Sequence, residues 1–160
     1  MPDRRTFLSH ALTAALGVLL PRALWGQDPQ PKNTARRRIT VYKSPTCDCC
    51  RKWIEHVDKE TDWVIDVKEM DDVTPMKDQL KIPKDMRSCH TAVVARTVFE
   101  GHVPADLMKL LLDRPRGVYG LAVPGMPVGT PGMEIPGQRA DRYNVVGFYR
   151  DGRTFIFASR

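Results

Sequence analysis

Apolar and polar residues alternate in six short stretches of the chain, and each stretch predicts a β-strand. Alternation with period two, enriched in β-branched and aromatic residues, is typical of strands that bury one face. The predicted strands cover residues 39–43, 63–67, 90–95, 97–102, 143–149 and 154–158. The dipeptide Asp151-Gly152 between the last two favours a tight turn, so these two strands are expected to form a β-hairpin.

Three stretches between the strands show the 3.6-residue period of an α-helix instead. The first begins near Cys47, and its apolar face is formed by Cys50, Trp53, Ile54 and Val57. A short helix is expected over residues 74–80. A third runs between Pro104 and Pro115, since proline favours the first turn of a helix and disrupts its interior.

Residues 121–138 contain four prolines and four glycines, and they predict neither helix nor strand. The segment repeats itself as Pro124-Gly125-Met126 and Pro131-Gly132-Met133. A loop of this length in a compact domain is usually functional or mobile. The order of elements predicts an α/β domain with a thioredoxin-like mixed sheet flanked by helices. This Pro/Gly/Met loop and the hairpin are added at its C-terminal end.

The N-terminal residues are typical of an export signal. Arg4-Arg5 precedes an apolar stretch over residues 11–20, and this combination resembles a twin-arginine signal. The apolar stretch is too short to span a bilayer. Residues 1–26 are therefore predicted to be a signal peptide, with an uncleaved anchor as the alternative. Either case predicts a periplasmic location. Residues 27–38 are expected to be a linker, and residues 39–160 a thioredoxin-like metal-binding domain.

Composition and charge narrow the possible functions. The 160 residues are 42% hydrophobic and 28% charged, which excludes a disordered chain. The net charge of +6 falls to +4 without residues 1–26, because three arginines and one aspartate are removed with them. The basic run Arg36-Arg37-Arg38 has no interleaved aromatic residues. We therefore expect no nucleic-acid partner and no membrane contact beyond the export signal.

Three of the four cysteines fall within four positions, at Cys47, Cys49 and Cys50. They lie where a strand is expected to turn into a helix, and the positive end of a helix dipole stabilises thiolates. The fourth, Cys89, immediately precedes a predicted strand. In a thioredoxin-like arrangement the loop before that strand packs beside the first turn of the helix, so fold-level analogy places Cys89 with the other three.

The residues leave three interpretations open. Four convergent thiolates favour Cu(I), Zn(II) or an iron–sulfur cluster, and adjacent Cys49-Cys50 suits sulfurs that bridge several Cu(I) ions. Cys47 and Cys50 alternatively have the spacing of a redox dithiol, which predicts a thiol–disulfide oxidoreductase without metal. The third possibility is one or two inert disulfides in an exported protein.

Four separated motifs then indicate a family. They occupy residues 41–53, 87–92, 100–104 and 120–133 and read VYKSPTCDCCRKW, RSCHTA, EGHVP and GLAVPGMPVGTPGM. In this order they resemble the CopG-type periplasmic copper-resistance proteins, over about residues 39–158. The resemblance implies a thioredoxin-like fold whose clustered cysteines bind several copper ions through bridging thiolates.

The resemblance also implies the metal site and its role. The cluster positions fall on Cys47, Cys49, Cys50 and Cys89, while His102, Met126 and Met133 match its further motif residues. It implies Cu(I) as the bound species, a copper redox role, and a periplasmic copper-handling or electron-transfer protein as partner. Two other histidines are expected to stand apart: His90 as a capping or core residue facing away from Cys89, and His56 as a solvated residue.

Overall fold

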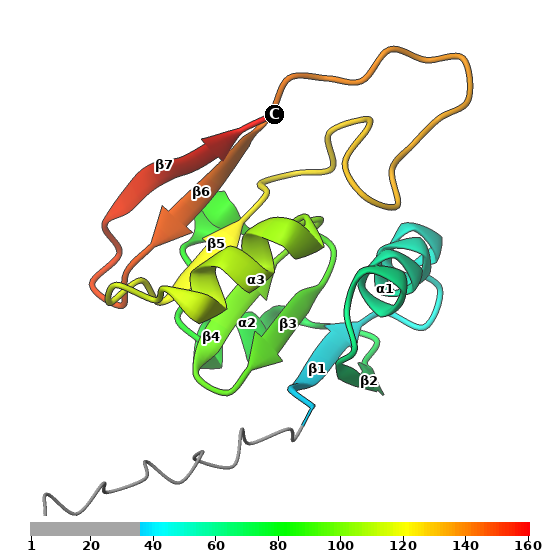
Figure 1. Ribbon diagram of the computed structural model, residues 1–160. Helices are drawn as coiled ribbons and strands as arrows, with labels where there is room; N and C mark the ends of the chain where they lie inside the picture. Colours follow the sequence, from blue (N-terminus) through cyan, green and yellow to red (C-terminus); the bar gives the residue numbers. More distant parts are fainter. Residues whose placement is uncertain (1–35) are drawn as a thin grey trace, which may run out of the picture. The chain divides into compact units, whose positions relative to one another are not determined.

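The computed structural model describes residues 36–160, which contain a seven-stranded mixed sheet (Figure 1). The strands are β1 (Arg38–Lys43), β2 (Val64–Glu69), β3 (Thr91–Val94), β4 (Thr97–Glu100), β5 (Gly120–Ala122), β6 (Asn144–Phe148) and β7 (Thr154–Ser159). Their order across the sheet is β2-β1-β3-β4-β5-β6-β7. The pairs β1–β2 and β4–β5 are parallel and the others antiparallel, so the sheet combines crossover connections with hairpins.

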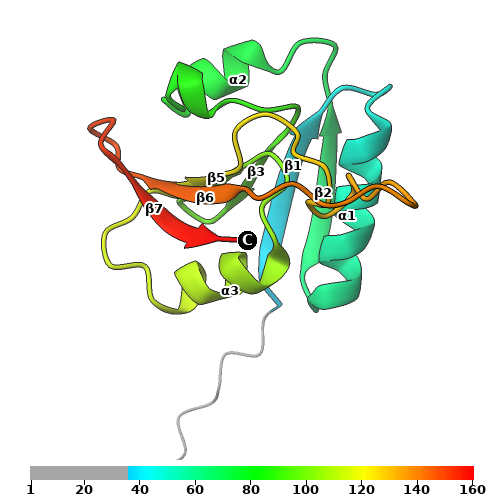
Figure 2. The same ribbon diagram turned by 90° about the horizontal axis from the view of Figure 1, so that it is seen from above.

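Helices cover both faces of this sheet (Figure 2). Helices α1 (Asp48–Glu60) and α3 (Ala105–Asp113) lie side by side on one face, and α2 (Thr74–Gln79) lies on the other. A single 3₁₀ turn, Lys84–Met86, follows α2. Among residues 36–160, no helix is long and apolar enough to cross a membrane.

The larger core lies between the sheet and the pair α1 and α3. Ile39 and Val41 point into it from alternate positions of β1, as the period of a strand requires. Trp53 of α1 is fully buried there, and its indole N–H donates to the carbonyl of Val103 at 2.9 Å. This hydrogen bond satisfies the polar end of the largest fully buried side chain and ties α1 to the segment before α3.

The predicted elements are confirmed with shifted boundaries, and the mixed sheet flanked by helices confirms the α/β class. β1 begins at Arg38, so the last residue of the predicted linker belongs to the sheet. The predicted signal peptide, residues 1–26, and residues 27–35 of the predicted linker lie outside the described residues. That the sheet is specifically thioredoxin-like stays a prediction.

One element was missed, because the segment 121–138 was expected to contain no strand. Its first residues belong to β5, which pairs with β4 on one side and β6 on the other. All three residues of β5 are buried. A strand covered on both faces shows no alternation of polar and apolar residues, and the prolines that follow it concealed the remaining signal. The rest of the segment, from Val123 to Gln138, has neither helix nor strand, as predicted.

A second prediction was wrong at His56, which is half-buried between α1 and the start of α3 rather than solvated. Its Nε2 accepts the backbone N–H of Ala105 at 3.3 Å. Burial is the largest influence on its pKa and lowers it from the ordinary value. His56 therefore has a structural role, helping to satisfy a free amide at the N-terminus of α3.

Candidate metal centre

The turn between β1 and α1 brings three thiols to one place. Cys47 is the N-cap of α1, and Cys49 and Cys50 occupy its first turn. Cys47 and Cys50 are joined by a disulfide across a Cα–Cα distance of 5.3 Å, whereas Cys49 is a free thiol 3.6 Å from the sulfur of Cys47. Cys50 is completely buried and Cys47 is partly exposed, so one sulfur of the disulfide is accessible and the other is shielded.

Cys89 reaches the same place from the loop before β3. Its free thiol lies 4.0 Å from the sulfur of Cys49. The sulfurs of Cys47, Cys49, Cys50 and Cys89 all lie within 4.8 Å of one another. The structure therefore brings together four cysteines that the sequence separates by up to 42 positions.

A buried polar network fixes the loop that carries Cys89. Glu100, at the end of β4, is fully buried and forms an ion pair with Lys77 of α2. Its carboxylate also accepts the hydroxyl of Thr91 at 2.6 Å and the backbone N–H of Ser88 at 2.7 Å. Burial raises the pKa of Glu100, and its hydrogen bonds with Lys77, Thr91 and Ser88 oppose that shift. Because Ser88 directly precedes Cys89, this carboxylate positions the thiol through the backbone.

His102 presents an unprotonated nitrogen to Cys89. Its Nδ1 lies 2.8 Å from the carbonyl of Pro131, and a carbonyl only accepts, so Nδ1 carries the hydrogen. In the neutral ring Nε2 is then a free acceptor, 3.1 Å from the sulfur of Cys89. Histidines that bind metal ions usually donate their other ring N–H to a carbonyl or carboxylate in this way, which fixes the tautomer and the orientation of the ring. Gly101 allows the placement: its φ is +69°, and an added Cβ would lie 2.6 Å from Ser88 and 2.7 Å from the carbonyl of Val123.

His90 was expected to be a core residue facing away from Cys89, and only the first half of that prediction is confirmed. It is fully buried against Trp53, yet its Nδ1 lies 3.2 Å from the sulfur of Cys89. The side-chain alternation used to predict its direction does not apply, because β3 begins one residue later, at Thr91. Cys89, His90 and His102 form a second group of convergent donor atoms. The adjacent residues Cys89-His90 were the feature of the sequence that could have indicated this second group of donors.

The Pro/Gly/Met loop reaches the site through its backbone. Figure 1 shows the segment crossing from β5 toward the start of α1. Gly132, with a φ of +85°, packs so closely that an added Cβ would lie 2.7 Å from the amide nitrogen of Trp53 and 2.8 Å from the carbonyl of Cys49. Met133 beside it is half-buried, whereas Met126 is 52% exposed. The structure therefore brings the loop backbone to the first turn of α1, and the role of Met126 and Met133 as thioether ligands stays a prediction.

Burial controls the protonation of the central donors. It raises the pKa of the Cys89 thiol to about 12, and the neighbouring Cys49 adds to the shift. Burial also lowers the pKa of His102, and it lowers that of His90 well below the ordinary value. The site therefore holds neutral imidazoles and a protonated thiol at neutral pH. The neutral imidazoles can bind a soft cation directly, whereas the Cys89 thiol has to lose its proton, after which a bound cation compensates the thiolate charge.

Four convergent sulfurs and two neutral imidazoles on a mixed α/β fold define a candidate binding protein for soft metal ions. Comparison with known proteins identifies the group to which it belongs. Two solved structures of copper resistance protein CopG, form 2 and form 1, are 39% and 40% identical to the chain, with TM-scores of 0.73 and 0.72. They cover 78% and 77% of this chain, which in turn covers 98% and 96% of them. The chain belongs to the CopG-type copper-resistance protein family.

A family model described as "Protein of unknown function, DUF411" matches residues 86–133, which span the Cys89 loop, His102 and the Pro/Gly/Met loop. No curated protein matches the chain. Cys47, Cys49 and Cys50 lie outside the span of that model. The resemblance first indicated by four sequence motifs is thus confirmed at the level of the family.

Proposed function

We propose that this protein is an exported copper-binding protein of copper resistance that holds several Cu(I) ions in a cluster bridged by Cys47, Cys49, Cys50 and Cys89. The observation that carries the proposal is the convergence of all four sulfurs within 4.8 Å. Thiolates are the ligands that Cu(I) prefers, and each can bridge two ions. Two solved relatives that are copper resistance proteins support copper over other soft cations.

The disulfide defines the condition under which the cluster forms. While Cys47 and Cys50 are joined, only Cys49 and Cys89 offer thiol sulfur. Two electrons from a dithiol convert the disulfide to two thiols and double the number of available sulfurs. Each thiol then loses its proton as it binds Cu(I). The protein is therefore expected to take up its full complement of copper only after reduction.

His102 and the Pro/Gly/Met loop are proposed to complete the site. The free Nε2 of His102 adds an imidazole ligand next to Cys89. The loop covers the first turn of α1 at Gly132, and Met126 and Met133 supply soft thioethers for incoming copper. Imidazole tolerates both oxidation states of copper, so this mixed donor set also supports a role in cycling copper between Cu(I) and Cu(II).

A second candidate function is favoured by the disulfide itself. Its partly exposed sulfur, on Cys47, lies in a hollow of about 450 Å³ lined also by Thr46, Asp48, Arg51 and Val67. This arrangement suits attack by a partner's thiolate on Cys47, with Cys50 as the shielded leaving group. The alternative is a periplasmic thiol–disulfide oxidoreductase that needs neither Cys49 nor copper.

Metal analysis of the purified chain separates the two candidates. The reduced protein is loaded anaerobically with Cu(I), desalted and measured for copper per chain. The cluster requires more than one copper per chain and a clear loss in both Cys49→Ser and Cys47→Ser. The oxidoreductase predicts that Cys49→Ser keeps full insulin-reduction activity while Cys47→Ser abolishes it. Less than one copper per chain, with no change in Cys49→Ser, would contradict the cluster.

Export to the periplasm by the twin-arginine route is part of the proposal. It is supported by Arg4-Arg5 and the short apolar stretch over residues 11–20. That location would bring the protein to a periplasmic copper-handling or electron-transfer partner. The paired substitution Arg4→Lys and Arg5→Lys should retain the chain in the cytoplasm, as measured by cell fractionation. Export at the normal level would contradict the route without affecting the copper site.

A further inference from the structure

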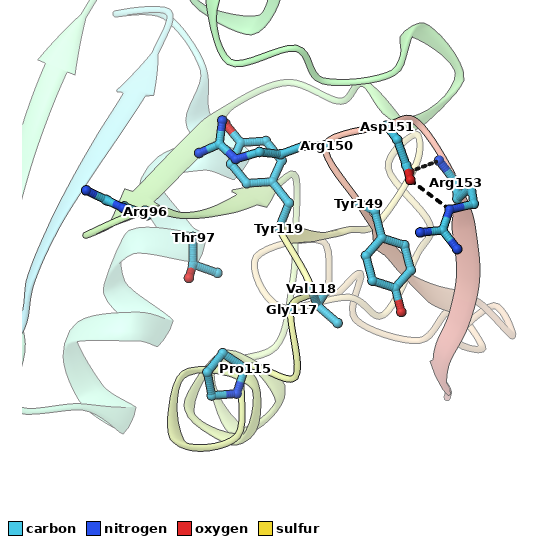
Figure 3. Close-up of a pocket in the computed structure, with 10 residues that line it drawn as sticks. All are labelled: Arg96, Thr97, Pro115, Gly117, Val118, Tyr119, Tyr149, Arg150, Asp151 and Arg153. Carbon is cyan, nitrogen blue, oxygen red and sulfur yellow. Dashed lines mark hydrogen bonds and ion pairs between the residues drawn. The ribbon is translucent and has the colours of Figure 1, made fainter.

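Positive charge gathers at the end of the sheet where β1 begins, away from the cysteines. A hollow of about 520 Å³ at this end is lined by Arg96, Arg150 and Arg153 (Figure 3). A second hollow, of about 550 Å³, shares Arg96 with the first and adds Arg37 and Arg38. The two hollows therefore form one continuous surface with five arginines.

Two further arginines extend this surface along the end of α3. Arg114 and Arg116 line a third hollow together with Leu110 and Phe157. Leu110 is 45% exposed, although it is a large apolar side chain in the middle of a helix. The surface, called the arginine face below, thus consists of seven arginines with an exposed leucine among them.

The charge of the arginine face is mostly uncompensated. Two aspartates lie within it: Asp113 pairs with Arg37, and Asp151 pairs with Arg153, each at 2.8 Å. No other arginine of the face forms an ion pair with a residue of the described part. Residues 36–160 contain 21 basic and 17 acidic side chains, a net charge of +4. The face alone has seven basic against two acidic, so the rest of the described chain is close to neutral.

Aromatic rings hold two of these guanidinium groups in place. Arg150 lies 4.0 Å above the ring of Tyr119, and Arg153 lies 4.9 Å from the ring of Tyr149 (Figure 3). The Tyr119 ring is nearly buried, and its hydroxyl donates to the carbonyl of Leu80 at 3.0 Å, so this support is itself fixed. Guanidinium groups held on rings lose little freedom when they bind, and their planar donors match the oxygens of a phosphate.

The arginine face and the metal centre lie at opposite ends of one strand. β1 begins at Arg38 on the face and ends at Lys43, just before the turn that carries Cys47. A strand of six residues is roughly 20 Å long.

We propose that the arginine face docks on an anionic phospholipid bilayer. Its arginines would contact headgroup phosphates and Leu110 would enter the headgroup boundary, which leaves the thiols at the end of β1 away from the lipid. The first two hollows share Pro115, and its chain neighbours Arg114 and Arg116 line the third, so the three form an extended surface rather than an enclosed pocket for one small anion. The exposed Leu110 among the arginines favours lipid over an acidic protein, because an apolar side chain gains from entering the headgroup boundary. The inference departs from the sequence expectation of no membrane contact beyond the export signal, and it is independent of the copper site.

Vesicle sedimentation of the full chain tests the proposal. The partition coefficient is measured on vesicles of phosphatidylcholine alone and on vesicles that also contain phosphatidylglycerol. The substitution set Arg96→Glu, Arg116→Glu and Arg150→Glu removes arginines that form no ion pair with a described residue. We expect it to lower binding to the anionic vesicles by roughly 100-fold or more and to leave binding to neutral vesicles unchanged. Binding of the wild-type chain to the anionic vesicles should also fall steeply as salt is raised.

The matched control reverses the same number of charges elsewhere, through Arg139→Glu, Arg142→Glu and Lys81→Glu, three exposed positions outside the face. It should bind anionic vesicles far better than the first set. Equal losses in the two sets would show that net charge, not the arginine face, governs binding and would overturn the proposal. So would wild-type binding that is no stronger on anionic vesicles than on neutral ones. Copper loading should be the same in both sets, so this test does not depend on the metal site.

Discussion

Each end of β1 gathers one type of side chain, thiols at one end and arginines at the other, and the two groups are held in place in different ways. At the Lys43 end, thiols are gathered in a partly buried site, where the position of Cys89 depends on Glu100 through the amide of Ser88 and its sulfur contacts His102. At the Arg38 end, exposed arginines from separate parts of the chain share a surface, and two of them rest on tyrosine rings. Removing one supporting residue should therefore damage the thiol end, whereas the arginine end should tolerate single changes.

The largest expected effect on stability is at Glu100. The change Glu100→Ala leaves buried Lys77 without its partner and frees the amide of Ser88, which should cost about 3–5 kcal/mol of unfolding free energy. Glu100→Gln keeps an acceptor for Ser88 and Thr91 and should cost less. Urea unfolding measures both. A loss in Glu100→Ala below about 1 kcal/mol would mean that the network does not support the thiol end.

The second expected effect is on the reactivity of Cys89. Burial raises the pKa of this thiol from 9.0 to about 12, so at neutral pH its thiolate fraction should be about 1,000-fold below that of a free cysteine. Its alkylation by iodoacetamide in the copper-free protein should be correspondingly slow. The rate should rise about tenfold per pH unit up to the shifted pKa, because only the thiolate reacts. Mass spectrometry of the alkylated peptide gives the rate, and a rate equal to that of a model cysteine peptide would show that the thiol is not shielded.

A smaller effect, confined to copper binding, is expected at His102. His102→Ala removes the imidazole beside Cys89 and should weaken Cu(I) binding by about 10- to 100-fold in a competition titration with a chelator. His56→Ala is the control, because His56 is a half-buried histidine of the same domain whose hydrogen bond among the described residues is with the amide of Ala105, whereas His102 is fully buried. Equal affinities of the two variants would exclude His102 from the metal site.

The smallest effect should come from the arginine end. Arg96 is exposed and forms no ion pair with another described residue, so Arg96→Ala should change the unfolding free energy by no more than about 0.5 kcal/mol. Its copper uptake should equal that of the wild type. A loss of unfolding free energy comparable to that of Glu100→Ala would show that the arginine end does not tolerate single changes better than the thiol end.

The sequence predicted those parts of the molecule in which the signal is local. The period of Cys50, Trp53 and Val57 predicted α1, and the cluster around Cys49 predicted the thiol turn. The participation of Cys89 needed an analogy between folds, because no local pattern reports a contact across 40 positions.

Three features were beyond such reasoning. The strand β5 is buried on both faces and so lacks alternation. His90 turns toward Cys89 because β3 begins one residue later than expected. The arginine face gathers residues from 37 to 153, and only the packing of the sheet and α3 brings them together. Each depends on long-range pairing that a single sequence does not display.

The central claim is that the four cysteines hold several copper ions through bridging sulfurs. X-ray absorption at the copper edge of the reduced, Cu(I)-loaded full chain tests it most directly, together with the copper content of the same sample. The account predicts more than one copper per chain, a first shell dominated by sulfur, and scattering from a second copper nearby. A single copper per chain with no copper neighbour, or a first shell without sulfur, would contradict it.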